Sequence, residues 1–181
     1  MKIFISVISL LIGAATMPHA SQFVFKSADG GVINLEDFKG KPVLVVNTAS
    51  RCGFTRQLET LQKLSDTYNG DGLTVLAVPS NDFNQELSSV EAVKEFCTVN
   101  YNLTLPMTDI TSVRGKNAHP FFRWVKETTG FSPKWNFNKI LIGPSGKVVQ
   151  TFGSLTRPMS GTITSEIEKL LQFDLIDQVS G

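Results

Sequence analysis

The chain has 181 residues, 41% of them hydrophobic and 18% charged, which is an ordinary composition for a globular domain large enough to bury a core. Its formal net charge of +1 gives no electrostatic reason to expect binding to nucleic acid or to an anionic membrane surface. Thirteen Phe against two Trp and two Tyr indicate a core rich in phenylalanine.

Residues 1–20 are predicted to form a secretory signal peptide. Lys2 precedes a mostly apolar stretch at residues 3–17, and small residues follow it. The stretch is shorter than the roughly 20 apolar residues of a membrane-spanning helix. Cleavage is predicted after Ala15 or Ala20, although Pro18 disfavours the second position, and an uncleaved membrane anchor is the alternative. The mature chain, residues 21–181, is therefore predicted to be one domain, periplasmic or secreted, with no stable insertion in a membrane.

The first half of the mature chain is predicted to alternate strands with helices. Residues 23–41 predict a hairpin with Asp29-Gly30-Gly31 as its turn. The apolar runs 42–50 and 73–81 are typical of strands that are buried on both faces. Between them a helix ends at residues 69–72, and its apolar side chains recur at helical spacing at Leu58, Leu61, Leu64 and Tyr68.

The second half predicts two helices, two strands and a last helix. Ser88 or Ser89 caps a helix over residues 88–100, and Gly130 ends another that begins near residue 119. Residues 138–153 predict two strands around a β-turn at 144–146. The last helix has an apolar face made of Ile163, Ile167, Leu170 and Leu171. This order predicts an α/β domain whose mixed sheet is flanked by helices, with the element order of a thioredoxin-like fold and an N-terminal hairpin.

Cys52 is the first candidate for chemistry, because it lies where a buried strand ends and a helix is predicted to begin. Backbone N–H groups at a helix N-terminus favour a thiolate, and Arg51 or Arg56 adds positive charge. The alternative is a buried thiol, or a structural disulfide with Cys97, the only other cysteine of an exported chain. Position alone leaves these interpretations open. Two cysteines and two histidines, one of them in the predicted signal peptide, do not make a usual structural zinc site.

Three segments, in order, resemble the signatures of the glutathione peroxidase family. "NTASRCGFT" (47–55) resembles N-V-A-S-x-C-G-x-T, and "VPSNDFNQE" (78–86) resembles F-P-x-N-Q-F-x-x-Q-E. "KWNFNKILIGPSGKVV" (134–149) resembles W-N-F-x-K-F-L, and "HPFFRWV" (119–125) lies between the last two segments. The matches cover most of residues 23–172. The resemblance implies a thioredoxin-like fold and the reduction of hydroperoxides by a thiol.

The resemblance also implies a catalytic set. Cys52 matches the peroxidatic position, which is selenocysteine in some members, and Gln85, Trp135 and Asn136 match the catalytic amides and indole. The loop between Phe83 and Gln85 is one residue shorter than in the family, and Leu87 stands in place of its proline, so Asn84 is the alternative to Gln85.

The chemistry fits these residue types. A thiolate attacks one peroxide oxygen, and N–H donors that are not nucleophiles stabilise the sulfur and the departing oxygen. Each residue alone has a structural alternative: Trp135 as a core ring, and Asn136 and Gln85 as turn residues.

Cys97 lies in "EFCTVNYNLTLPM" (95–107), which matches an E-F-C-x-x-N-Y segment of cysteine-dependent family members. The resemblance implies that Cys97 resolves a Cys52 sulfenic acid into a disulfide. A permanent disulfide and an inert thiol remain the alternatives. Ser80 replaces a further family cysteine. Because Cys52 must also face Trp135 and Asn136, the reduced form is predicted to hold the two sulfurs apart, and oxidation to unwind the helix at 88–100.

The two-cysteine pattern favours a thioredoxin-like protein over glutathione as the reductant of the disulfide. No cofactor is implied, since the sulfur itself cycles. The short connection at residues 125–138 favours a monomer, because some members carry an insertion there that builds oligomers.

Other classes fit less well. Val45 and Ala49 occupy the Pro and Thr positions of the peroxiredoxin motif, no C-x-x-C is present, and His119 is interpreted as structural. A peroxide sensor that passes oxidation to a partner protein, and a binding module stapled by a disulfide, remain alternatives.

Overall fold

The computed structural model describes residues 19–179, with side chains up to residue 172. The predicted signal peptide therefore lies outside the described residues except for His19 and Ala20. The strands and helices follow the predicted order, with three short 3-10 helices added. The elements are η1 (Ala20–Gln22), β1 (Val24–Lys26), β2 (Val32–Asn34), η2 (Leu35–Phe38), β3 (Val43–Thr48), α1 (Gln57–Tyr68), η3 (Asn69–Asp71), β4 (Thr74–Pro79), α2 (Val90–Tyr101), α3 (Pro120–Thr129), β5 (Lys139–Ile142), β6 (Val148–Phe152) and α4 (Gly161–Val179).

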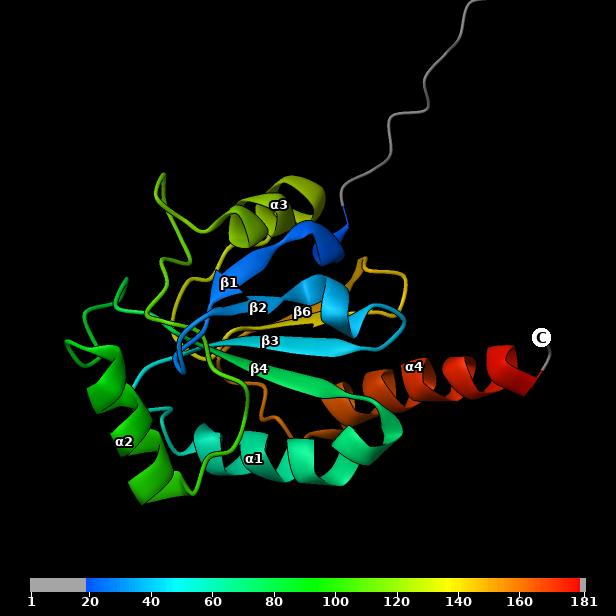
Figure 1. The fold of residues 1–181 in the computed structure, drawn as a ribbon, viewed down its shortest axis with the longest axis horizontal. Coiled ribbons are helices and arrows are strands. Elements are labelled where there is room, and N and C mark those ends of the chain that lie inside the picture. The colour runs from blue at the N-terminus through cyan, green and yellow to red at the C-terminus, as the bar shows by residue number, and fades with distance from the viewer. Residues whose placement is uncertain (1–18, 180–181) are drawn as a thin grey trace, which may run out of the picture.

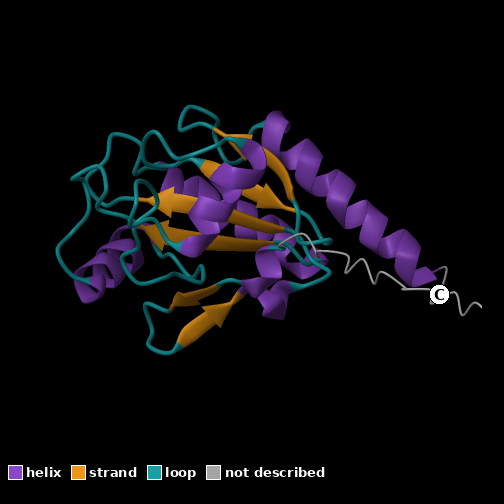
Figure 2. Ribbon diagram, turned by 90° about the horizontal axis from the view of Figure 1, so that it is seen from above, coloured by secondary structure: helices purple, strands orange, loops and turns teal. Residues whose placement is uncertain are grey.

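The main sheet has four strands in the order β4-β3-β5-β6 (Figure 1). β3 and β4 are parallel and joined through α1, whereas β5 runs antiparallel to both β3 and β6. The predicted parallel pair and mixed sheet are thus confirmed. β1 and β2 form the predicted hairpin as a separate antiparallel sheet, which stands apart from the four-stranded sheet in Figure 2.

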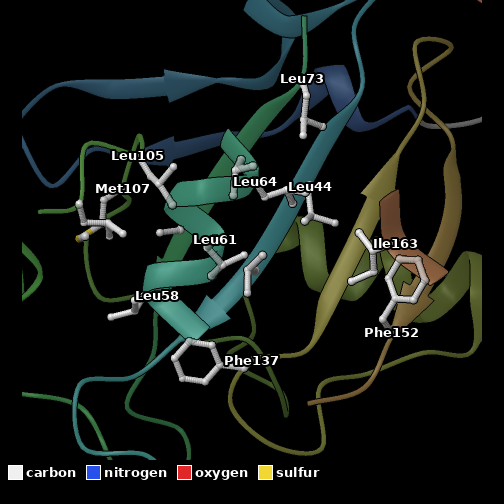
Figure 3. Close-up of a cluster of buried hydrophobic side chains, with 14 of the residues drawn as sticks. Leu44, Leu58, Leu61, Leu64, Leu73, Leu105, Met107, Phe137, Phe152 and Ile163 are labelled. Atoms are coloured by element: carbon white, nitrogen blue, oxygen red, sulfur yellow. The ribbon is translucent and has the colours of Figure 1, made fainter. Parts of the chain in front are cut away.

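The four-stranded sheet separates two hydrophobic cores. All six residues of β3 are buried, and they alternate between the cores: Leu44 and Val46 face one side, Val43 and Val45 the other. On the first side the α1 leucines pack toward Leu44 (Figure 3). On the second side α3 and the hairpin close the core with a group of buried phenylalanines, Phe25, Phe121 and Phe122. Because both faces of β3 contact a core, residues 43–46 are all apolar, whereas Asn47 and Thr48 at the end of the strand are buried and polar.

The helix ends use the signals that the sequence carries. The Ser89 hydroxyl accepts a hydrogen bond from the Ala92 N–H and caps α2. Gly130 ends α3 with a φ of 73°, which glycine adopts without strain. His119 caps α3, stacks on Phe25 with ring centroids 4.1 Å apart, and burial lowers its pKa. The structural interpretation of His119 is confirmed.

The last helix lies against the first core through its first half and extends beyond the rest of the fold in Figure 1. Ile163, Ile167 and Leu171 are buried and Leu170 packs beside them, as the spacing predicts. None of the helices within residues 19–179 is long and apolar enough to cross a membrane.

Candidate active site

Three chain segments meet beyond the carboxyl end of β3. Asn47, on β3, joins two of them, because its side-chain amide donates to the Trp135 carbonyl at 3.0 Å and accepts from the Asn138 N–H at 3.0 Å. The Phe137 N–H donates to the Asn47 carbonyl at 2.6 Å. These bonds fix residues 135–138 against the last residues of β3. Asn47 was not predicted as a supporting residue, although it stands within the matched "NTASRCGFT" segment.

The third segment, residues 81–87, is attached to the two residues that precede Cys52. The Arg51 N–H donates to the Gln85 carbonyl at 2.9 Å, and the Ser50 N–H donates to Glu86 Oε1 at 3.0 Å. Glu86 is buried, and burial raises the pKa of its carboxyl group. Its other oxygen, Oε2, is buried without a hydrogen-bond partner in the part of the chain described. Hydrogen bonds from the backbone of Ser50 and Arg51 to the Glu86 side chain and the Gln85 carbonyl therefore hold the loop beside the cysteine.

The structure brings Gln85, and not Asn84, to Asn136. Asn136 Nδ2 donates to Gln85 Oε1 at 2.9 Å, and Asn136 is fully buried. Asn84 is exposed and has a φ of 57°, a left-handed conformation that Asn tolerates better than most residues. The shortened loop therefore turns at Asn84 and still presents the Gln85 amide inward.

Trp135 is not a core ring. Its side chain is 40% exposed and makes no hydrogen bond within residues 19–179, so its indole N–H is free to bind a ligand. The indole lies against Phe83, with ring centroids 5.4 Å apart. The structural alternative for Trp135 is wrong.

Cys52 lies in a turn and not at the start of a helix. The sequence places the helix directly after Cys52, but α1 begins at Gln57. Thr55 explains the delay: its hydroxyl accepts from the Cys52 N–H at 3.0 Å and lies 2.8 Å from the Ala49 carbonyl, which closes a turn over these residues. Within the turn the Phe54 N–H donates to Cys52 Sγ at 3.4 Å. A backbone donor thus contacts the sulfur, as predicted, but it comes from the turn.

Cys97 is buried in α2, and neither cysteine forms a disulfide. Burial, and secondarily the charge of Glu86, raise the pKa of the Cys97 thiol to about 12. Both sulfurs belong to the hydrophobic core on the α1 side of the sheet. Cys97 is therefore a protonated thiol at neutral pH in this state, whereas Cys52, 8% exposed, lies at the surface end of the core.

A second layer of polar groups supports the Trp135–Asn136 segment. The Ser154 hydroxyl donates to the Asn136 carbonyl at 2.6 Å, and the Gln57 amide donates to the Ser154 carbonyl at 2.7 Å. Lys139 Nζ, fully buried, donates to Gln57 Oε1 at 2.6 Å and to the Thr156 carbonyl at 2.6 Å. Burial lowers the pKa of Lys139 to about 7. Lys139 and Glu86 both match letters of the family signatures, but the sequence interpretation gave them no role.

The surroundings of the site include an open groove of about 390 Å³ beside the Cys52 turn. It is lined by Gly53, Phe54, Arg56, Gln57, Thr60, Leu155 and Arg157. Among residues 19–179, no three His, Cys, Asp or Glu side chains gather in a way that would hold a metal ion.

Comparison with known proteins gives the following similarities. The family model described as glutathione peroxidase matches residues 20–126. The glutathione peroxidase of Lactococcus lactis subsp. cremoris is 43% identical over 148 residues, covering 79% of this chain and 93% of that protein. The hydroperoxy fatty acid reductase of Synechocystis is 40% identical over 163 residues, covering 82% and 94%. A thioredoxin family protein of Chlorobium tepidum, 18% identical, superposes with a TM-score of 0.63 over 88% of this chain and 99% of that chain, which confirms the thioredoxin-like fold.

Proposed function

The chain belongs to the glutathione peroxidase family, and from this premise we propose that it is a thiol peroxidase that reduces hydrogen peroxide and organic or lipid hydroperoxides. One observation carries the proposal at the level of the site. The hydrogen bond between Asn136 and Gln85 joins two predicted catalytic amides from distant segments. The Gln85 carbonyl in turn accepts a hydrogen bond from the N–H of Arg51, the residue before Cys52.

Peroxide reduction begins at the Cys52 sulfur. Its thiolate attacks the terminal peroxide oxygen, the O–O bond breaks, and Cys52 becomes a sulfenic acid. The leaving alkoxide or hydroxide takes a proton and departs as alcohol or water. Gln85, with both amide N–H groups available, and the free indole N–H of Trp135 stabilise the thiolate and the leaving oxygen. Asn136 orients Gln85 by donating to its carbonyl oxygen.

Cys97 resolves the sulfenic acid. Its sulfur attacks the Cys52 sulfur, the S–O bond breaks, and the oxygen leaves as water, which yields a Cys52–Cys97 disulfide. A thiol reductant then restores both thiols. A thioredoxin-like dithiol protein suits this two-cysteine cycle better than glutathione, and the protein acts as a monomer.

The predicted signal peptide within residues 1–20 directs export of the protein, with cleavage after Ala15 and not after Ala20, so that residues 16–20 stay in the mature chain. Supporting this choice of position, the Ala20 N–H donates to the Gly146 carbonyl at 2.8 Å and Ala20 is buried. Cleavage after Ala20 would remove this contact, whereas cleavage after Ala15 retains it. N-terminal sequencing of the mature protein tests the proposal, and an intact Met1 in a soluble cytosolic fraction would refute it.

Mass spectrometry of the reduced protein after one equivalent of hydrogen peroxide tests the peroxidase function. The expected product has lost two hydrogens, as a disulfide, and the Cys97→Ser variant has instead gained one oxygen. A protein whose mass does not change would contradict the proposal. Repeated turnover with a generic dithiol is expected of the enzyme, whereas a single oxidation that passes to one partner protein would indicate a sensor.

A further inference from the structure

A strip of side chains leads from Trp135 to a positive charge at the surface. The Arg114 guanidinium lies over the ring of Phe83, 4.8 Å from the ring centroid, and Phe83 in turn contacts Trp135. Phe83 is only 8% exposed and lies beneath the other two side chains, whereas Trp135 and Arg114 are both exposed. The strip therefore has an apolar surface at the end near the candidate catalytic residues and a cation at the other end.

The loop that carries Arg114 is fixed by the residue that precedes Phe83. Asp82 Oδ2 accepts from the Arg114 N–H at 3.0 Å and from the Val113 N–H at 2.6 Å, and its carboxylate also accepts from the Ser112 hydroxyl at 3.1 Å. One segment thus sets both the aromatic ring and the backbone that aims the guanidinium over it. The hydrogen bonds to Asp82 therefore fix the backbone of Arg114 beside the site.

The charge of Arg114 has no ion-pair partner in the described part of the chain. Its side chain takes part in no ion pair or hydrogen bond within the part of the chain that is described, where the ion pairs are Lys39–Glu36, Lys94–Asp29 and Lys169–Glu166. A guanidinium whose N–H groups have no partner in the protein can bind a ligand with them, and its planar set of donors matches a carboxylate in bidentate fashion. The geometry therefore fits a ligand with an apolar chain and an anionic end.

We propose that Arg114 is a specificity-determining residue that binds the carboxylate of a fatty acid hydroperoxide while the peroxide group reacts at Cys52. The acyl chain lies along Phe83 and Trp135. The protein consequently prefers a free-acid hydroperoxide to the corresponding ester, in which the charge is absent. This inference rests on the proposed peroxidase function and adds to it the class of substrate that the site selects.

The test follows the oxidation of Cys52 alone, without any reductant. Reduced protein is mixed rapidly with linoleic acid hydroperoxide, its methyl ester or hydrogen peroxide, the lipids being below their aggregation concentrations. The second-order rate constant is measured by quenching and mass spectrometry. The variants are Arg114→Gln and, as a control with the same loss of charge, Lys63→Gln on the exposed side of α1.

Arg114→Gln is expected to lower the ratio of the free-acid rate to the ester rate roughly tenfold, the value of one charge-assisted interaction. Lys63→Gln is expected to keep that ratio within about twofold of the wild type. Arg114→Lys, which keeps the charge without the planar fork, is expected to fall between them.

Two results would overturn the inference while leaving the peroxidase function intact. They are equal wild-type rates on acid and ester, and equal effects of Arg114→Gln and Lys63→Gln on the ratio of those rates. If no hydroperoxide oxidises Cys52 in the wild type, the proposed function itself fails.

Discussion

The side chains of Asn136 and Gln85 meet in a hydrogen bond of 2.9 Å although 51 residues separate them. The bond uses a donor of Asn136 and the acceptor of Gln85, so the Gln85 amide nitrogen is turned away from Asn136 with both hydrogens free. Asn136 Oδ1 is buried without a hydrogen-bond partner in the described part of the chain. An unpaired buried acceptor lowers the stability of the fold, so this orientation of Asn136 points to a functional role. The pair therefore orients a free donor on the residue whose carbonyl is hydrogen-bonded to Arg51, the residue before Cys52.

We expect Gln85→Glu to lower the rate of Cys52 oxidation roughly 100-fold, because it keeps the acceptor for Asn136 but removes the two donors that stabilise the thiolate and the leaving oxygen. Asn84→Gly is the matched control, since glycine adopts the left-handed φ of 57° and removes the neighbouring amide. Rapid-mixing kinetics with hydrogen peroxide measure both. If Asn84→Gly were slow and Gln85→Glu fast, Asn84 would be the donor.

The two cysteine variants separate the two chemical steps. Cys52→Ser is expected to abolish peroxide consumption without unfolding the protein, because the nucleophile is lost. Cys97→Ser is expected to retain the first oxidation, to stop turnover with a thioredoxin-like reductant, and to accumulate sulfenic or sulfinic acid on Cys52. Peroxide consumption and intact mass provide the measurements. Normal turnover of Cys97→Ser with thioredoxin would show that Cys97 is not the resolving thiol.

Alkylation reports the state of Cys97. Its folded pKa of about 12 exceeds the ordinary value of 9.0, because burial and the Glu86 charge disfavour the thiolate. Iodoacetamide is therefore expected to modify Cys52 in the native reduced protein near pH 8 and to leave Cys97 almost untouched. Glu86→Gln, which retains an acceptor for the Ser50 N–H, is expected to speed the slow modification of Cys97. Peptide mass spectrometry measures each site, and equal labelling of both cysteines would contradict the expectation.

Buried Lys139 is expected to make stability depend on pH. Its folded pKa of about 7 lies below the unfolded value of 10.5, so between these pH values the unfolded chain binds more protons and the free energy of unfolding rises with pH. The contribution of uncharged Lys139 to the free energy of unfolding is complete above pH 10.5 and is lost as the pH falls through about 7. The slope approaches about 1.4 kcal/mol per pH unit within this window.

Urea denaturation of the wild type and of Lys139→Met at several pH values from neutral to mildly alkaline measures this contribution. The difference between the two free energies of unfolding should increase with pH in favour of the wild type. Parallel curves would mean that Lys139 stays charged in the fold, held by the two oxygens that accept from it.

The fold could be predicted from the sequence because burial leaves periodic patterns. Residues 43–46 of β3 are all apolar because both faces of the strand are buried, and α1 repeats leucine at helical spacing since one face meets the sheet. The predicted start of α1, directly after Cys52, was wrong because the Thr55 hydroxyl closes a turn before the helix begins. A side-chain contact of that kind leaves no periodic pattern in the sequence.

The site could be predicted in its residues but not in its support. The signatures pointed to Cys52, Gln85, Trp135 and Asn136, whereas the bonds that hold them come from Asn47, Ser154 and Glu86, through contacts between distant segments. The exposure of Trp135 could not be predicted either, because a tryptophan considered alone is more often a core ring. In the structure Phe83 packs against the indole, and Trp135 is still 40% exposed.

We expect the disulfide to require α2 to open. A disulfide needs Cα atoms roughly 4.4–6.8 Å apart, yet Cys97 is buried in the folded helix, as a free thiol beside the charge of Glu86. α2 is held less firmly than α1: only Val93 and Cys97 of its side chains are buried, and Val99 is 75% exposed. A helix with so few buried apolar contacts opens locally at lower cost than a core element.

Hydrogen exchange on the reduced and oxidised proteins is expected to show loss of amide protection from about residue 89 to residue 100 on oxidation. α1 serves as the internal control, because Leu58, Leu61 and Leu64 anchor it in the core and its protection should not change. The Cys97→Ser variant, treated with peroxide, should keep α2 protected, since no disulfide can form. Protection of α2 that is the same in the reduced and the disulfide forms would defeat the proposal, because the two sulfurs would then meet without unwinding the helix.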